Sequence, residues 1–207
     1  MDRSPRPEDD GAATHARDAR VWVVADCVAT VALLVLIVAA FAWPDLSGVK
    51  GKASTGRAIV YPLGAFVVPA LWWLRWRRQG RPFPFLGDTL VTLPWLTDTV
   101  GNRLGLFESV AWWDDWMHFA NWALLTAGVL VLTTDRRTGA WATYERALAF
   151  GLIAALLWEI AEYWAFIRFS AELTTAYTDT LGDMSLGTLG SLSAATVAVL
   201  VRRHTSR

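Results

Sequence analysis

The sequence predicts an all-α membrane protein, a polytopic bundle of about six transmembrane helices with both termini in the cytoplasm. Hydrophobic residues make up 54% of the 207 residues and the mean hydropathy is +0.32, which is too apolar for a soluble domain of this length. Apolar runs long enough to cross a bilayer recur along the chain, and arginine gathers between alternate runs. The 19 basic and 19 acidic residues cancel, so no overall basic field argues for a nucleic-acid partner.

The first span is expected directly after a polar tail. Residues 1–20 carry prolines and charges of both signs without apolar periodicity, which predicts a disordered cytoplasmic tail. Residues 21–43 then form a run long enough to cross the bilayer. Ala40, Phe41 and Ala42 resemble the cleavage site of a signal sequence. Asp26 and the mixed charges before the run favour a first helix that is retained.

Five later stretches complete the bundle. The stretch 83–107 is interrupted by acids, a proline and a glycine, so it either crosses the bilayer or dips in and returns. We expect 21–203 to form one transmembrane helical domain and 204–207 to be the end of a cytoplasmic tail. The uninterrupted runs are 58–76, 112–133, 146–169 and 181–201.

The distribution of basic residues favours six spans. If 83–107 does not cross, the nineteen Lys and Arg residues divide about ten to nine between the two sides, which carries no signal under the positive-inside rule. With six spans, only Lys50, Lys52, Arg57, Arg103 and Arg168 lie outside, and the others are cytoplasmic. Those are Arg3, Arg6, Arg17, Arg20, Arg75, Arg77, Arg78, Arg81, Arg136, Arg137, Arg146, Arg202, Arg203 and Arg207.

Ionisable side chains interrupt the apolar pattern in the stretches 113–118, 158–163 and 178–183. A carboxylate within a membrane helix costs about 2.5–3.5 kcal/mol on insertion scales, so several together need a partner, a proton or a metal. In the six-span topology these stretches lie at about the same depth near the exoplasmic face, together with Asp98 and Asn102 at the outer end of the third span.

Spacing places two polar side chains of each stretch on one helix face, because residues three or four apart are neighbours on a helix. Inward-facing carboxylates and an imidazole are how helical bundles build metal sites, and such ligands suit Mg²⁺, Mn²⁺, Fe²⁺ or Zn²⁺. The sequence is equally compatible with a cluster that binds no metal. Close carboxylates cannot all ionise, so one of them would then carry a proton. The candidate metal ligands are Asp115, His118, Glu159, Glu162, Asp179 and Asp183, with Asp98 and Asn102 as further members.

Simpler explanations exist for single residues. Asp114 and Asp179 stand at expected helix starts, where N-capping and the helix dipole account for an aspartate. His118 is also compatible with a structural histidine bonded to a neighbouring helix. Glu159 and Glu162 have no capping role, since both lie within an apolar helix.

A short repeat supports a common site. Residues 97–102 and 178–183 share four identical positions, Thr-Asp-Thr and a glycine, and each ends on a polar residue. Repeats with a binding site between them are common in transporters.

The motifs resemble those of a known family. The order Asp-Asp-x-x-His-Phe, Trp-Glu-x-x-Glu-Tyr and Asp-Thr-x-x-Asp-Met is similar to YjdF-type uncharacterised bacterial inner-membrane proteins over about residues 84–200. A fainter likeness to VanZ-like membrane proteins rests on the first element. Gly182 replaces a tryptophan expected in YjdF itself, which indicates a divergent branch. The matching positions are Asp115, His118, Phe119, Glu159, Glu162, Tyr163, Asp179, Thr180, Asp183, Met184, Gly187 and Gly190.

The resemblance implies a multi-pass protein of the bacterial inner membrane without an established activity. Three functions remain open at this point. The first is a metal-dependent enzyme acting on a lipid or lipid-linked substrate, in which Glu159, Glu162 and His118 are the candidate catalytic residues and a divalent metal ion is the candidate cofactor. The second is a cation- or proton-coupled transporter using the same acids. The third is a structural membrane protein.

Overall fold

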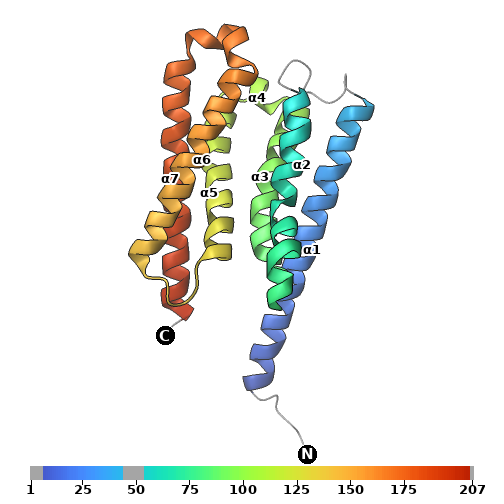
Figure 1. The fold of residues 1–207 in the computed structure, drawn as a ribbon, viewed down its shortest axis with the longest axis vertical. Coiled ribbons are helices and arrows are strands. Elements are labelled where there is room, and N and C mark those ends of the chain that lie inside the picture. The colour runs from blue at the N-terminus through green and yellow to red at the C-terminus, as the bar shows by residue number, and fades with distance from the viewer. Residues whose placement is uncertain (1–6, 44–53, 206–207) are drawn as a thin grey trace, which may run out of the picture.

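The computed structural model describes residues 7–43 and 54–205, and within them every regular element is helical. Figure 1 shows long helices running side by side along the vertical axis, with the N- and C-terminal ends of the described chain at the lower end. The helices are α1 Pro7–Ala42, α2 Ser54–Leu71, α3 Phe85–Arg103, α4 Leu106–Ser109, α5 Trp113–Thr133, α6 Ala140–Ala165 and α7 Ala176–Thr205. A π-helical turn, Trp72–Trp76, extends α2, and 3-10 turns at Ile167–Phe169 and Ala171–Thr174 join α6 to α7.

Every predicted apolar stretch overlaps a helix, and the interrupted stretch 83–107 contains α3 and the first two residues of α4. Helix α1 begins at Pro7, inside the stretch 1–20 that we expected to be a disordered tail. Proline is favoured at the first helical position, and the segment that follows is rich in alanine, the strongest helix former. The prediction for residues 1–6 lies outside the described residues.

Within the described residues, four helices are long and apolar enough to cross a membrane, at Ala19–Ala40, Trp113–Thr133, Ala140–Phe169 and Ala176–Thr205. Helices α2 and α3 are not among these four, and α3 carries Asp88, Asp98 and Asn102. Large apolar side chains are exposed along α1, α2, α6 and α7, as expected where lipid replaces water. Lipid is therefore the surrounding partner that this surface requires.

Helix α5 is the central element of the bundle. It packs against α7, α6 and α3, while α3 also packs against α1 and α2. The chain thus forms an N-terminal half (α1 to α3) and a C-terminal half (α5 to α7) that meet where α3 contacts α5 (Figure 1).

Small residues bring α5 and α7 close together. A Cβ atom at Gly190 would lie 2.2 Å from the backbone oxygen of Phe119, and one at Gly187 would lie 2.7 Å from the Trp122 ring. The hydroxyl groups of Thr126 and Ser191 hydrogen-bond across the same interface at 2.9 Å. Without a hydrophobic driving force between helices in lipid, such close packing and hydrogen bonding are what hold helices together.

The lower end of the C-terminal half is closed by Arg202 near the end of α7. Its guanidinium donates to the backbone oxygens of Asp135 and Thr138 at 3.2 and 3.3 Å and to the Thr143 hydroxyl at 2.8 Å. In the α5–α6 connection, the Asp135 carboxylate accepts hydrogen bonds from the Thr138 hydroxyl and the Arg137 backbone N–H, which lowers the pKa of Asp135 below its usual value. Arg202 therefore ties this connection to α7.

The contact at Gly190 provides a stability test. We expect Gly190→Ala to lower the free energy of unfolding by about 1–3 kcal/mol, because the added methyl group meets rigid backbone of α5 and must push the helices apart. The measurement is the thermal unfolding temperature of the protein in detergent. Gly182→Ala is the matched control on the same helix, since nothing lies within 4 Å of its Cβ position and alanine favours a helix. Equal unfolding temperatures for the two variants would contradict the close approach.

Candidate functional site

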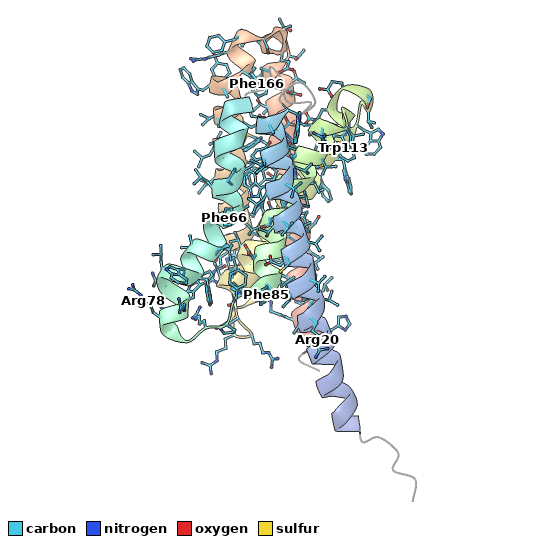
Figure 2. All side chains as sticks on the ribbon, turned by 90° about the vertical axis from the view of Figure 1, so that its right-hand side faces the viewer. Arg20, Phe66, Arg78, Phe85, Trp113 and Phe166 are labelled. Atoms are coloured by element: carbon cyan, nitrogen blue, oxygen red, sulfur yellow. The ribbon has the colours of Figure 1, made fainter. Side chains whose placement is uncertain are left out.

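Polar side chains from four helices lie together at the upper end of the bundle. Helices α3 and α6 end there, and α5 and α7 begin there, so residues far apart in the sequence reach the same depth. Figure 2 shows Trp113 and Phe166 at this end, and Arg20 and Arg78 toward the other. A cavity of about 680 Å³ lies between the helices. Its polar lining includes Asp98, Asn102, Asp114, His118, Glu162, Asp179 and Asp183.

His118 of α5 is the central side chain of this site. Its Nδ1 lies 3.1 Å from Asp183 Oδ1 and 3.9 Å from Glu159 Oε1, and its Nε2 lies 3.7 Å from Asp114 Oδ1. The His118 side chain is 11% exposed, and Glu159 and Asp183 are each 6% exposed. Although Asp183 is close, His118 Nδ1 forms no aligned hydrogen bond within the described chain. Acids from three helices therefore surround one imidazole.

The side chains have the composition and spacing of a metal site. Ligand atoms of Asp114, His118 and Asp183 lie within 4.8 Å of one another, and the same holds for His118, Glu159 and Glu162. His118 belongs to both sets. Carboxylate oxygens and one imidazole nitrogen match the ligand preferences of Mg²⁺, Mn²⁺, Fe²⁺ and Zn²⁺.

A hydroxyl group orients Glu159 of α6. Thr180 of α7 donates a 3.1 Å hydrogen bond to Glu159 Oε2, which leaves the other carboxylate oxygen directed to His118. Support of a ligand by a neighbouring hydrogen bond is a common feature of metal sites, because it fixes the direction of the ligand.

The α3 wall of the cavity is a second polar group. Asp98 accepts hydrogen bonds from the Tyr61 hydroxyl of α2 and from the side-chain amide of Asn102, the latter at 3.1 Å. Asn102 is 1% exposed, and among the described residues its Oδ1 finds no hydrogen-bond donor. A buried acceptor without a donor costs about 1–3 kcal/mol. Because Asn102 lies on the cavity wall, its Oδ1 is available to a donor group of a molecule bound there.

The sequence prediction and the structure differ at the start of α5. Asp115, which we expected beside His118, is exposed and does not line the cavity. Asp114 faces the cavity instead, one turn before His118 at a spacing of four residues. Spacings of three and four both place residues on one helix face, and only the rotation of α5 selects between them.

Asp114 and Asp179 are not the N-cap residues of their helices, although an aspartate in the first turn still suits the helix dipole. The N-cap residue of α5 is Trp112 and α7 begins at Ala176, so both aspartates lie inside the first turn and point to the cavity. The repeated segments meet at the same cavity in opposite orientations, since Asp98 is near the end of α3 and Asp179 near the start of α7. A helix-start explanation therefore fits only the second copy.

Three contacts were not predicted from the sequence. Tyr61 lies in an apolar run without a motif, and nothing in the sequence pairs it with Asp98. Thr180 belongs to the repeated Thr-Asp-Thr segment, which was a usable signal. The third is a buried pair of acids outside the cavity, Asp26 in α1 and Asp88 in α3, whose carboxyl groups are neighbours.

Comparisons with known proteins place the chain in the membrane class. Residues 27–204 match the model of a family described as "Predicted membrane protein (DUF2238)". Searches of the curated proteins and of the solved structures gave no match. The specific likenesses to YjdF-type and VanZ-like proteins stay predictions.

The bond between Thr180 and Glu159 provides a test of the site geometry. We expect Thr180→Val to lower the free energy of unfolding by about 1–3 kcal/mol, because a buried carboxylate oxygen loses its donor. Thermal unfolding of the metal-free protein measures this. The control is Thr178→Val, the same change at an exposed position of α7. The assigned bond is incorrect if both variants unfold at the temperature of the parent.

Proposed function

The chain belongs to the DUF2238 family of predicted membrane proteins, and we propose that it is a metal-dependent enzyme acting on a lipid or lipid-linked substrate. The observation that carries the proposal is the two sets of three candidate ligands that share His118 inside an apolar helical bundle, with the ligand atoms of each set within 4.8 Å of one another. Acids are expensive in such a bundle and are kept where they serve a function. A bound divalent cation would offset their charge.

We assign the metal to Asp114, His118, Asp183, Glu159 and Glu162. Of the other predicted ligands, Asp179, Asp98 and Asn102 are assigned to the walls of the cavity, and Asp115 is left out because it is exposed. When bound, a divalent ion would polarise an ester or phosphoryl oxygen and lower the pKa of bound water.

The chain's own groups would supply the rest of the chemistry. Glu159, Glu162 and His118 are also the candidate acid and base groups, a role open to whichever of them does not bind the metal, because they lie at the centre of the site. Asn102 Oδ1 is proposed to accept a hydrogen bond from the substrate, since it has no donor among the described residues.

The shape of the cavity supports an enzyme over a transporter. A volume of about 680 Å³ lies in the range of about 300–1,000 Å³ that small-molecule sites occupy. Its lining comes from the upper ends of the helices and their connections, such as Phe107 and Ser170. In the lower half, Leu130, Ala147 and Ala195 pack together in a buried core. A polar lining that stays at the upper end suits a bound substrate, whereas ion transport requires a polar path to the other side.

We also propose the full topology: six spans, both termini cytoplasmic, a single domain over 21–203 and a location in the bacterial inner membrane. The three pairs of antiparallel helices, with α2 and α3 as spans, would return the chain to its starting side. Arginines concentrate at the lower end, in the α2–α3 and α5–α6 connections and at the end of α7. The cavity then faces the exoplasmic side.

Metal binding tests the proposed site. We expect the chelator-treated parent to bind about one equivalent of Mn²⁺ or Zn²⁺ by calorimetry, and Asp114→Asn to weaken binding at least about tenfold, because a ligand is lost. Asp115→Asn is the matched control, one residue away and exposed, and it should bind as the parent does.

A parent that binds no metal, or two variants that bind alike, would overturn the metal site. Transport provides the alternative outcome. If metal-free protein in liposomes carries a cation or proton flux that Glu162→Gln abolishes, the acids serve the transporter function instead.

Labelling of single cysteines tests the topology. In a Cys27→Ala background, which removes the only cysteine of the sequence, we expect Glu172→Cys in the α6–α7 connection to react with a membrane-impermeant maleimide in intact cells. Gly139→Cys in the α5–α6 connection should react only after permeabilisation. Both residues are exposed, so a difference in labelling reports the side of the membrane. Labelling of both in intact cells would contradict the six-span orientation.

A further inference from the structure

A second cavity of about 750 Å³ lies beside the first, between α2 and α3 on one side and α5 and α6 on the other. We call it the apolar groove. Its walls are aliphatic and aromatic side chains, among them Leu63, Val67, Leu125 and Leu157, and Glu162 is the one charged residue in its described lining. Such walls do not favour bound water, since they offer it few hydrogen-bond partners.

The apolar groove and the polar cavity adjoin and share part of their lining. Trp95, Trp122, Trp158 and Glu162 line both. Glu162 also belongs to a set of candidate metal ligands, so the groove ends at the reactive part of the site. A molecule that fills both compartments must have one polar end and one apolar end.

The groove is open on the lipid-facing side of the bundle. Leu63 of α2 and Leu157 of α6 line its two walls and are 68% and 60% exposed. Along α6 its lining runs from Phe150 to Phe166, which is about 24 Å at the helical rise of about 1.5 Å per residue. That length exceeds one leaflet of a hydrocarbon core of about 30 Å.

Trp95 stands at the junction of the two compartments. Its ring lies against α2, where a Cβ atom at Gly64 would come within 2.4 Å of it, and its centroid is 5.3 Å from Tyr61 and 6.1 Å from Trp158. The Trp95 indole N–H is buried and has no acceptor among the described residues. A polar group of a bound molecule would supply that acceptor.

We propose that the apolar groove binds the hydrocarbon chain of a membrane lipid whose polar headgroup lies in the cavity beside His118. The inference rests on the proposed function and specifies its substrate class, an amphiphile that enters laterally between α2 and α6. A helix of a partner protein is a poor occupant, because its diameter with side chains is about 10–12 Å and it cannot continue into a polar pocket as a single chain does.

Photolabelling tests the groove directly. The parent is reconstituted in vesicles with a phosphatidylglycerol that carries a diazirine in one acyl chain, and labelled peptides are identified by mass spectrometry. We expect labels to concentrate on the groove-lining segments of α2 and α6. Ala154→Phe, which fills the groove from α6, should lower this labelling to the level of the outer lipid-facing surface.

The matched control is Ala149→Phe, the same change at an exposed position of α6 that does not line the groove. Val67→Phe is a second filling variant from the opposite wall, at a position already 44% exposed, and it serves if Ala154→Phe does not fold. Labels spread evenly over all lipid-facing helices, or unchanged labelling in both filling variants, would overturn the inference. Crosslinks to a second copy of the chain at the groove would do the same.

Two further measurements identify the class of lipid and separate a failure of this inference from a failure of the proposed enzyme function. Competition by an unlabelled polyprenyl phosphate but not by unlabelled phosphatidylglycerol assigns the chain to a lipid-linked isoprenoid, and the reverse assigns it to a glycerolipid. Labelling is measured without metal. A labelled groove in a protein that binds no metal therefore overturns only the proposed enzyme, and metal binding without groove labelling overturns only the present inference.

Discussion

The close approach of α5 and α7 is the constraint on which the site depends. Gly190 lets the α7 backbone come against the backbone of α5 near Phe119, directly beside His118. At that separation Asp183 Oδ1 lies 3.1 Å from the imidazole. A wider spacing between α5 and α7 would leave Asp183 as an isolated carboxyl group in an apolar surrounding, which has a high free-energy cost. Packing and chemistry are thus coupled, since the glycines that hold the helices together also set the distances in the site.

The fold was largely predictable because membrane helices follow from length and hydrophobicity, and the up-and-down order of the helices follows from the connections. The gathering of Asp98, His118, Glu162 and Asp183 at one depth was predictable for the same reason. Rotation of a helix about its axis was not, because it depends on partners that a single stretch of sequence does not contain. Asp114 and Asp115 are therefore indistinguishable by spacing but have different surroundings.

Contacts between helices could not be predicted either. Tyr61 bonds to Asp98 across the α2–α3 interface, and Trp95 lies between two compartments, yet both residues look like ordinary members of an apolar stretch. Helix α1 begins at Pro7, in a stretch whose charge and proline content suggested disorder, and its alanine content and the position of the proline favour a helix.

The neighbouring carboxyl groups of Asp26 and Asp88 would have a consequence for biogenesis in the proposed six-span topology. Helix α3 is too polar to qualify as a span by composition, and Asp88 is only 2% exposed. Because α1 precedes α3 in the chain, it would already lie in the bilayer when Asp88 enters, and Asp26 would offer the partner that lipid cannot. In that topology the first helix would assist the insertion of the third, although no described residue of α1 lines either cavity. Shortened forms of the protein that begin at α2 would then fail to insert, whatever their catalytic groups.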